Sequence, residues 1–157
     1  MSITLYHGTL REDLPNILIS GLKPFEGWAY GSTTGVFLSQ NPETALGWAK
    51  MRYQFKNEFR LEVTRFEDEH TIGETDQLLV ILEVTIPSSQ FGLLRADMEQ
   101  AEDVGFEGGP LDWEKSLQDI GDVAFNAIIP VSWIHILPST VPFEPPPGSR
   151  GSYRNSL

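Results

Sequence analysis

The stretch Leu5–Thr9, with sequence LYHGT, is the most informative part of this chain, because an apolar strand-like run ends there in a His-Gly pair. A second strand-like segment, Gly35–Ser39 (GVFLS), follows one short amphipathic helix expected over residues 13–20. The triplet Asn-Pro-Glu at residues 41–43 then predicts the start of a longer helix. A His at the rim of a strand, followed by a helix and a strand carrying an aromatic residue, suits a cleft for a flat, ring-bearing ligand.

Capping signals define the two helices that flank these strands. Asp13 can cap the first helix with Pro15 in its first turn, and Gly21 is placed to end it. Asn41 is the expected N-cap of the second helix, which continues at helical spacing to about residue 57. Helical and strand-like segments in this order predict an α+β domain.

The rest of the chain carries weaker signals. Leu78–Ile86 is apolar on both faces and predicts a central strand. Residues 60–66 fit either a strand or a ragged helix. Further expectations are loops over 25–34 and 67–77, short helices near 94–102 and 111–119, and strands over 4–6, 123–129 and 133–137.

Length and composition favour one domain. The chain has 157 residues, 40% of them hydrophobic, which suffices for a core without staples. We place the domain at residues 1–138 and a Pro-, Gly- and Ser-rich tail at residues 139–157. No apolar run is long enough to span a bilayer and no secretion signal is visible, so we expect a cytoplasmic protein without a membrane partner.

Charge and metal-ligand content exclude several kinds of function. The absence of cysteine excludes disulfides, thiolate zinc sites and a cysteine nucleophile. His7, His70 and His135 are too scattered to indicate a metal site, so no metal is expected. The 22 acidic residues against 11 basic ones give a net charge of −11, and no basic stripe is present. Duplex DNA or a long RNA is therefore not the expected partner.

Taken in order, these motifs resemble the ADP-ribosyltransferase superfamily. The resemblance spans roughly residues 4–137 and is greatest to the branch with the His-Tyr-Glu signature. That branch includes the poly(ADP-ribose) polymerases and the RNA 2′-phosphotransferases. The resemblance implies a single domain with a split, mostly antiparallel β-sheet, a central NAD cleft and flanking helices.

The resemblance also implies roles for individual residues. His7 matches the residue that holds an NAD ribose, and the backbone of Gly8 matches the one that grips the nicotinamide carboxamide. Phe37 stands where the family usually has the tyrosine on which nicotinamide stacks, and a phenyl face can stack as well. The implied NAD-binding set is His7, Gly8, Thr9, Tyr30, Phe37 and Ser39.

Asp122 stands where the family usually has its catalytic glutamate, and His7 completes the implied catalytic pair. Departure of nicotinamide leaves an oxocarbenium-like ribosyl cation, which a nearby carboxylate can stabilise. Aspartate is one methylene shorter than glutamate, so three glutamates earlier in the chain are alternatives. They are Glu99, Glu102 and Glu107.

Each of these residues also has a purely structural interpretation. His7 could hydrogen-bond a turn, Phe37 could lie in the core and Asp122 could be a turn residue. Trp48 is expected in the core, with the cleft as an alternative, and His135 is expected to face solvent.

The leading hypothesis is an NAD-dependent ADP-ribosyltransferase that transfers ADP-ribose to a macromolecular acceptor. The acidic composition favours a protein or small-molecule acceptor over nucleic acid, and the small size favours a toxin or phage-type effector. One alternative is an RNA 2′-phosphotransferase, although that chemistry needs several arginines and only Arg11 is near the motifs. The other is a catalytically inactive module that binds NAD or ADP-ribose.

Overall fold

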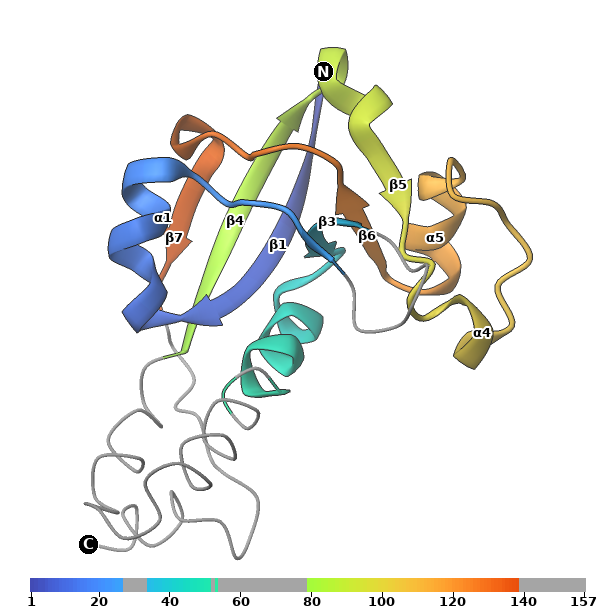
Figure 1. Ribbon diagram of the computed structural model, residues 1–157, viewed down its shortest axis with the longest axis horizontal. Helices are drawn as coiled ribbons and strands as arrows, with labels where there is room; N and C mark the ends of the chain where they lie inside the picture. Colours follow the sequence, from blue (N-terminus) through green and yellow to red (C-terminus); the bar gives the residue numbers. More distant parts are fainter. Residues whose placement is uncertain (27–33, 52, 54–78, 139–157) are drawn as a thin grey trace, which may run out of the picture.

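The protein is an α+β domain built on one antiparallel sheet (Figure 1). The computed structural model describes residues 1–26, 34–51, 53 and 79–138. The strands lie in the order β5-β6-β3-β1-β4-β7, and the short β2 pairs with β3. Their bounds are β1 Ser2–Leu10, β2 Phe25–Glu26, β3 Thr34–Ser39, β4 Leu79–Pro87, β5 Leu94–Ala96, β6 Asp122–Phe125 and β7 Ile134–Leu137.

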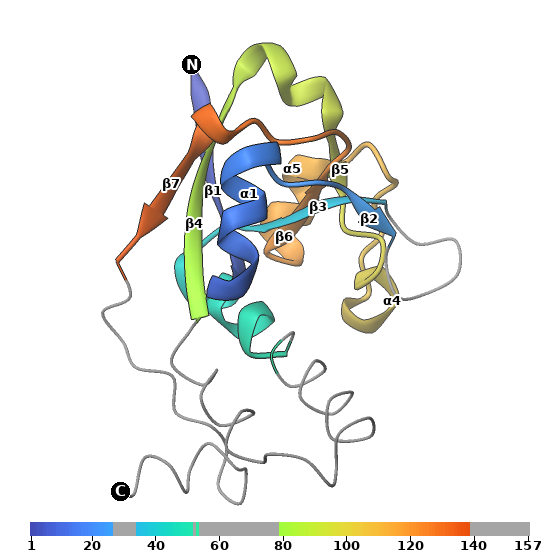
Figure 2. The same ribbon diagram turned by 60° about the vertical axis from the view of Figure 1, so that its left-hand side comes forward.

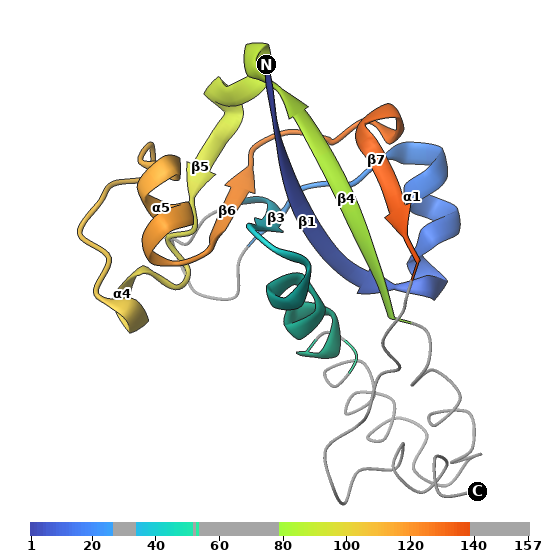
Figure 3. The ribbon, with the colours of Figure 1, turned by 180° about the vertical axis from the view of Figure 1, so that it is seen from behind.

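Short helices connect these strands. They are η1 (Arg11–Asp13), α1 (Leu14–Ser20), a helix over residues 42–51, η2 (Ser88–Leu93), α4 (Ala101–Val104), α5 (Trp113–Asp119) and η3 (Val131–Trp133). Seen from behind, α4 and α5 lie at the β5–β6 end of the molecule, and α1 lies at the β7 end (Figure 3). None of the helices in the described ranges is long and apolar enough to cross a membrane.

The sheet is joined at a narrow seam. β1 pairs with β4 from Ser2↔Pro87 to Leu10↔Leu79, whereas its register with β3 is confined to Tyr6↔Ser39. We call this β1–β3 junction the seam. It divides the sheet into a β1–β4–β7 half and a β5–β6–β3 half, and all the strand pairs are antiparallel.

The two faces of the sheet carry different layers. The main core contains inward-facing residues from both halves of the sheet, packed with Ile17 of α1. Figure 2 shows α1 in front of β1 and β4, on this face. The helix over residues 42–51 contributes to a second, smaller cluster made of Leu10, Ala49, Tyr53 and Leu79. We call these the α1 face and the 42–51 face.

The predicted starts of the first two helices and the predicted end of the first are present. Asn41 Oδ1 accepts a hydrogen bond from Thr44 N at 2.8 Å, as an N-cap should. Gly21 ends α1 with φ +78°, a backbone conformation that favours glycine. Asp13 occupies the N-cap position of α1, but its side chain makes no capping bond. It accepts instead from Thr9 Oγ1 at 3.3 Å.

The sequence-based prediction is wrong near residue 94. Leu94–Ala96 is the strand β5 rather than the start of a helix, because Leu94 and Ala96 are buried alternately against β6. Only Ala101–Val104 of the expected segment is helical. Non-local pairing overrides the local helical signal here.

Several boundaries also differ. β6 ends at Phe125 rather than at residue 129, and Ile129 instead forms an isolated bridge with Leu22. Residues 25 and 26, expected in a loop, pair with β3 as β2. β1 runs over the whole of Ser2–Leu10 because β4 supplies a partner for every residue.

Some predictions fall on residues outside the described ranges. They are the role of Tyr30, most of the 25–34 loop, the helix beyond residue 53, His70, segments 60–66 and 67–77, and the tail over residues 139–157.

Candidate functional site

An open pocket of about 370 Å³ lies between β1 and α1. Its wall on β1 is made by His7 and Thr9, two of the residues singled out from the sequence. An apolar part is formed by Ile17, Leu22 and Val36. Its other polar residues are Asp13, Asn16, Ser20 and Lys23. A concave site with an apolar part and several hydrogen-bonding groups is typical of pockets for small organic ligands.

The ring of His7 spans the seam. Its Nδ1 lies 2.8 Å from the backbone oxygen of Phe37 on β3. A carbonyl oxygen can only accept, so Nδ1 must carry the hydrogen and Nε2 is the acceptor nitrogen of the neutral ring. The fold therefore positions one imidazole at the edge of the pocket, with its Nδ1 donating to the Phe37 carbonyl.

Gly8, the next residue, faces the other side of β1. A Cβ built on it would lie 1.9 Å from Ala45 O and 3.0 Å from Ala49 Cβ. The backbone of the 42–51 helix therefore approaches β1 closely, and only glycine permits this. This packing gives the His-Gly pair a structural reason in addition to any role in ligand binding.

Asp122 lies at the start of β6 and is almost completely buried, at 3% exposure. Its Oδ1 accepts from Ser39 Oγ at 2.5 Å. Its Oδ2 accepts from Trp48 Nε1 at 3.3 Å and from Gln100 Nε2 at 2.8 Å. Three donors from separate segments of the chain thus converge on one carboxylate, which fixes its position.

Strand register places His7 and Asp122 on opposite faces of the sheet. Tyr6 is paired with Ser39, and Ser39 is paired with Asp122, so these three side chains share the 42–51 face. His7 follows Tyr6 and therefore points to the α1 face. The two residues are nevertheless close in the sheet, because two strand spacings amount to about 10 Å.

The other residues of the implied set divide in the same way. Thr9 lies with His7 in the pocket. Phe37 and Ser39 alternate with Val36 along β3, so their side chains share the face of Asp122. The structure thus brings together His7 with Thr9, and Ser39 with Asp122. It does not place all of them around one pocket.

Gln100 links Asp122 to a second buried carboxylate. Its Nε2 donates to Asp97 Oδ2 at 2.7 Å as well as to Asp122. Asp97 is 3% exposed, and its Oδ1 accepts from Glu99 N. Ser116 Oγ, which is fully buried, donates to Asp122 O at 2.6 Å and accepts from Asp97 N at 3.0 Å. The amide of Gln100 and the hydroxyl of Ser116 thus hold the two aspartates together.

Burial raises the pKa of Asp97 above its ordinary value of 3.8. The hydrogen bond from Gln100 partly offsets this, and the charge of nearby Asp122 raises the pKa of Asp97 further. The folded protein therefore binds the Asp97 proton more tightly than the unfolded chain does. The resulting contribution to stability is present below pH 3.8 and is lost as pH rises through the folded-state pKa.

We therefore expect the unfolding free energy of the wild type to increase relative to that of Asp97→Asn as pH is lowered from about 7 towards 4. Asparagine does not titrate, so the difference between the two proteins isolates the proton uptake of Asp97. Urea unfolding at several pH values measures it. The variant Asp103→Asn, at an exposed position of α4, reports the effect of removing one surface charge. A difference that is constant with pH, or that has the opposite slope, would contradict this assignment.

The remaining predicted residues lie as follows. Trp48 is half-buried rather than part of the core, and its Nε1 donates to Asp122. Glu102 and Glu107 are exposed near α4. Glu99 is half-buried, and its amide donates to Asp97. His135 is exposed on β7, as expected.

Sequence reasoning missed Asp97, Gln100 and the pocket carboxylate of Asp13. Asp97 and Gln100 carry no motif, since their partners are distant in the sequence. Asp13 had a signal, its place four residues after Thr9 at a helix start, but this was interpreted as capping alone. Within the described residues no group of three or more histidine or acidic side chains could hold a metal ion.

Comparison with protein-family models finds none that matches the chain, and comparison with curated proteins finds no significant match.

Proposed function

We propose that the protein is an NAD-dependent ADP-ribosyltransferase that transfers ADP-ribose to a protein acceptor. The observation that carries this proposal is the strand register around the seam. His7 and Gly8 follow Tyr6 on β1, Tyr6 is paired with Ser39 on β3, and Ser39 is paired with Asp122 on β6. His7, Gly8 and Asp122 are the three positions that the sequence resemblance assigns to ribose binding, carboxamide binding and catalysis. The α+β class and the antiparallel sheet are compatible with it.

In this proposal the two faces of the sheet at the seam bind different parts of NAD. Asp122 and Gly8 face one side, and His7 with its pocket faces the other. A carboxylate that assists cleavage must lie near the nicotinamide ribose, so His7 and its pocket take the adenosine ribose. In this arrangement Nε2 of His7 accepts from a ribose hydroxyl, because Nδ1 is committed to the Phe37 carbonyl.

The proposed reaction breaks the bond between C1′ of the ribose and the nicotinamide nitrogen. The bonding electron pair leaves with nicotinamide, which becomes neutral, and positive charge develops on the ribosyl ring. In this proposal Asp122 stabilises this charge electrostatically, which requires the nicotinamide ribose to reach the 42–51 face, where the carboxylate is buried. A nucleophile of the acceptor forms the new bond to C1′, and its proton passes to the carboxylate or to water. Ser39, Trp48 and Gln100 hold the carboxylate in place for this step.

The test uses NAD labelled in its adenylate half, incubated with the purified protein and a cell lysate, and nicotinamide release is followed in parallel. We expect label on a protein band with the wild type. We expect a loss of about 100-fold with His7→Ala, because ribose positioning is removed. The matched control is His135→Ala, which removes an exposed imidazole on β7.

Equal labelling by the wild type and His7→Ala would contradict the proposal. Binding of NAD without release of nicotinamide, in the presence of lysate, would identify the protein as a binding module instead. Label that appears on RNA rather than on protein would show that the acceptor is RNA.

A further inference from the structure

The pocket beside His7 contains a carboxylate as well as hydroxyl and amide groups. Asp13 lines it together with Thr9, Asn16 and Ser20. Carboxylate oxygens only accept hydrogen bonds, and they repel anions. The hydroxyl and amide groups can either donate or accept hydrogen bonds. Asp13 therefore determines which groups the pocket can accept next to it.

The Asp13 carboxylate is tied to the strand that carries His7. Its Oδ2 accepts from Thr9 Oγ1 at 3.3 Å, and Thr9 is only 2% exposed. Thr9 lies two residues after His7, so both side chains project from the same face of β1. The carboxylate and the imidazole thus line the same pocket, and Thr9 connects Asp13 to the strand that carries His7.

A ribose 2′-hydroxyl and a ribose 2′-phosphate interact with the Asp13 carboxylate in opposite ways. A 2′-hydroxyl can donate to a carboxylate, and Rossmann-type dinucleotide-binding folds bind the NAD ribose through an acidic residue in this way. A 2′-phosphate brings close to two negative charges and no donor. We propose that Asp13 makes the pocket selective for NAD over NADP, by accepting from the 2′-hydroxyl of the adenosine ribose and repelling a 2′-phosphate.

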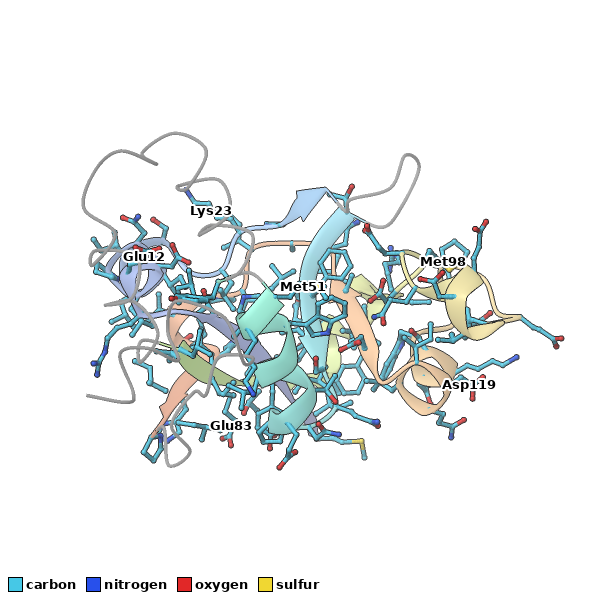
Figure 4. All side chains as sticks on the ribbon, turned by 90° about the horizontal axis from the view of Figure 1, so that it is seen from below. Glu12, Lys23, Met51, Glu83, Met98 and Asp119 are labelled. Atoms are coloured by element: carbon cyan, nitrogen blue, oxygen red, sulfur yellow. The ribbon has the colours of Figure 1, made fainter. Side chains whose placement is uncertain are left out.

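Lys23 also lines the pocket and supplies a positive charge. In Figure 4 it lies, with Glu12, at the α1 end of the molecule, opposite Met98 and Asp119. The diphosphate common to NAD and NADP is the natural partner of such a cation, so this contact does not discriminate between them. The same carboxylate disfavours an RNA 2′-phosphate, which counts against the phosphotransferase alternative.

This inference rests on the proposed function. A direct binding measurement distinguishes a failure of the Asp13 role from a failure of the proposed function. Calorimetry measures the affinity of the full chain for ADP-ribose and for ADP-ribose 2′-phosphate. We expect the wild type to prefer ADP-ribose on the order of 100-fold, because like charges are opposed in a partly desolvated pocket. Asp13→Asn keeps an oxygen that can accept from Thr9, and we expect it to reduce this preference at least about tenfold.

The matched control is Glu12→Gln, which removes one negative charge from the neighbouring residue of η1, outside the pocket lining. It should leave the preference as in the wild type. Thermal unfolding of both variants establishes that they are folded. A wild type that binds the two ligands equally, or a preference unchanged in Asp13→Asn, would overturn the role of Asp13 while the proposed function stands. Binding of neither ligand would overturn both.

Discussion

We expect Gly8→Ala to lower the free energy of unfolding by about 3 kcal/mol or more, one of the largest effects available in this domain. The added methyl carbon would lie 1.9 Å from Ala45 O and 2.8 Å from Ala45 C. These are backbone atoms inside the 42–51 helix, so no side-chain rotation can relieve the contact. The helix would have to move away from β1, which would also open the cluster formed by Leu10, Ala49 and their neighbours. Urea unfolding followed by circular dichroism measures the loss.

Gly47→Ala is the matched control for this prediction. Gly47 lies in the same helix, and a Cβ built on it meets no atom within 4 Å. We expect this variant to be more stable than the wild type by up to about 1 kcal/mol, since alanine is the better helix former. If Gly8→Ala matched Gly47→Ala in stability, the close approach of the helix to β1 would be wrong.

The second large effect is expected at Asp122. Replacement by alanine would leave Ser39 Oγ, Trp48 Nε1 and Gln100 Nε2 without the carboxylate that they share. Because Asp122 and Ser39 are almost completely buried, water cannot readily take the place of the lost carboxylate. We expect a loss of roughly 3–5 kcal/mol in the free energy of unfolding.

This stability effect determines which variant can test the catalytic role. Loss of activity in Asp122→Ala would reflect unfolding as well as chemistry. Asp122→Asn keeps the size and one acceptor oxygen, so we expect a smaller loss of about 1–3 kcal/mol. If Asp122 acts as proposed, nicotinamide release by folded Asp122→Asn falls by about 100-fold or more. An alanine variant as stable as the wild type would contradict the hydrogen-bond network, and an unchanged rate in Asp122→Asn would contradict the catalytic role.

Much of the fold could be predicted because its signals are local. Asn41 caps the helix that follows it, and Gly21 ends α1 with a positive φ that its lack of a side chain permits. The strand predicted over residues 78–86 is present as β4, Leu79–Pro87, although it lies next to the edge strand β7 rather than at the centre of the sheet. The helix expected near residue 94 was wrong because β6 supplies a partner for β5, and that pairing has no local signal.

The candidate site shows the same division. The sequence by itself determined which residues we propose for the chemistry, namely the imidazole of His7, the backbone of Gly8 and the carboxylate of Asp122. Only the tertiary structure decided which of them face the same way. The register Tyr6↔Ser39↔Asp122 puts the carboxylate on the 42–51 face, and a shift of one residue would have moved it to the face of His7. The donors around Asp122 and the carboxylate beside His7 likewise depend on contacts between segments distant in the chain, because a side chain's hydrogen-bond partners follow from packing and not from neighbouring residues.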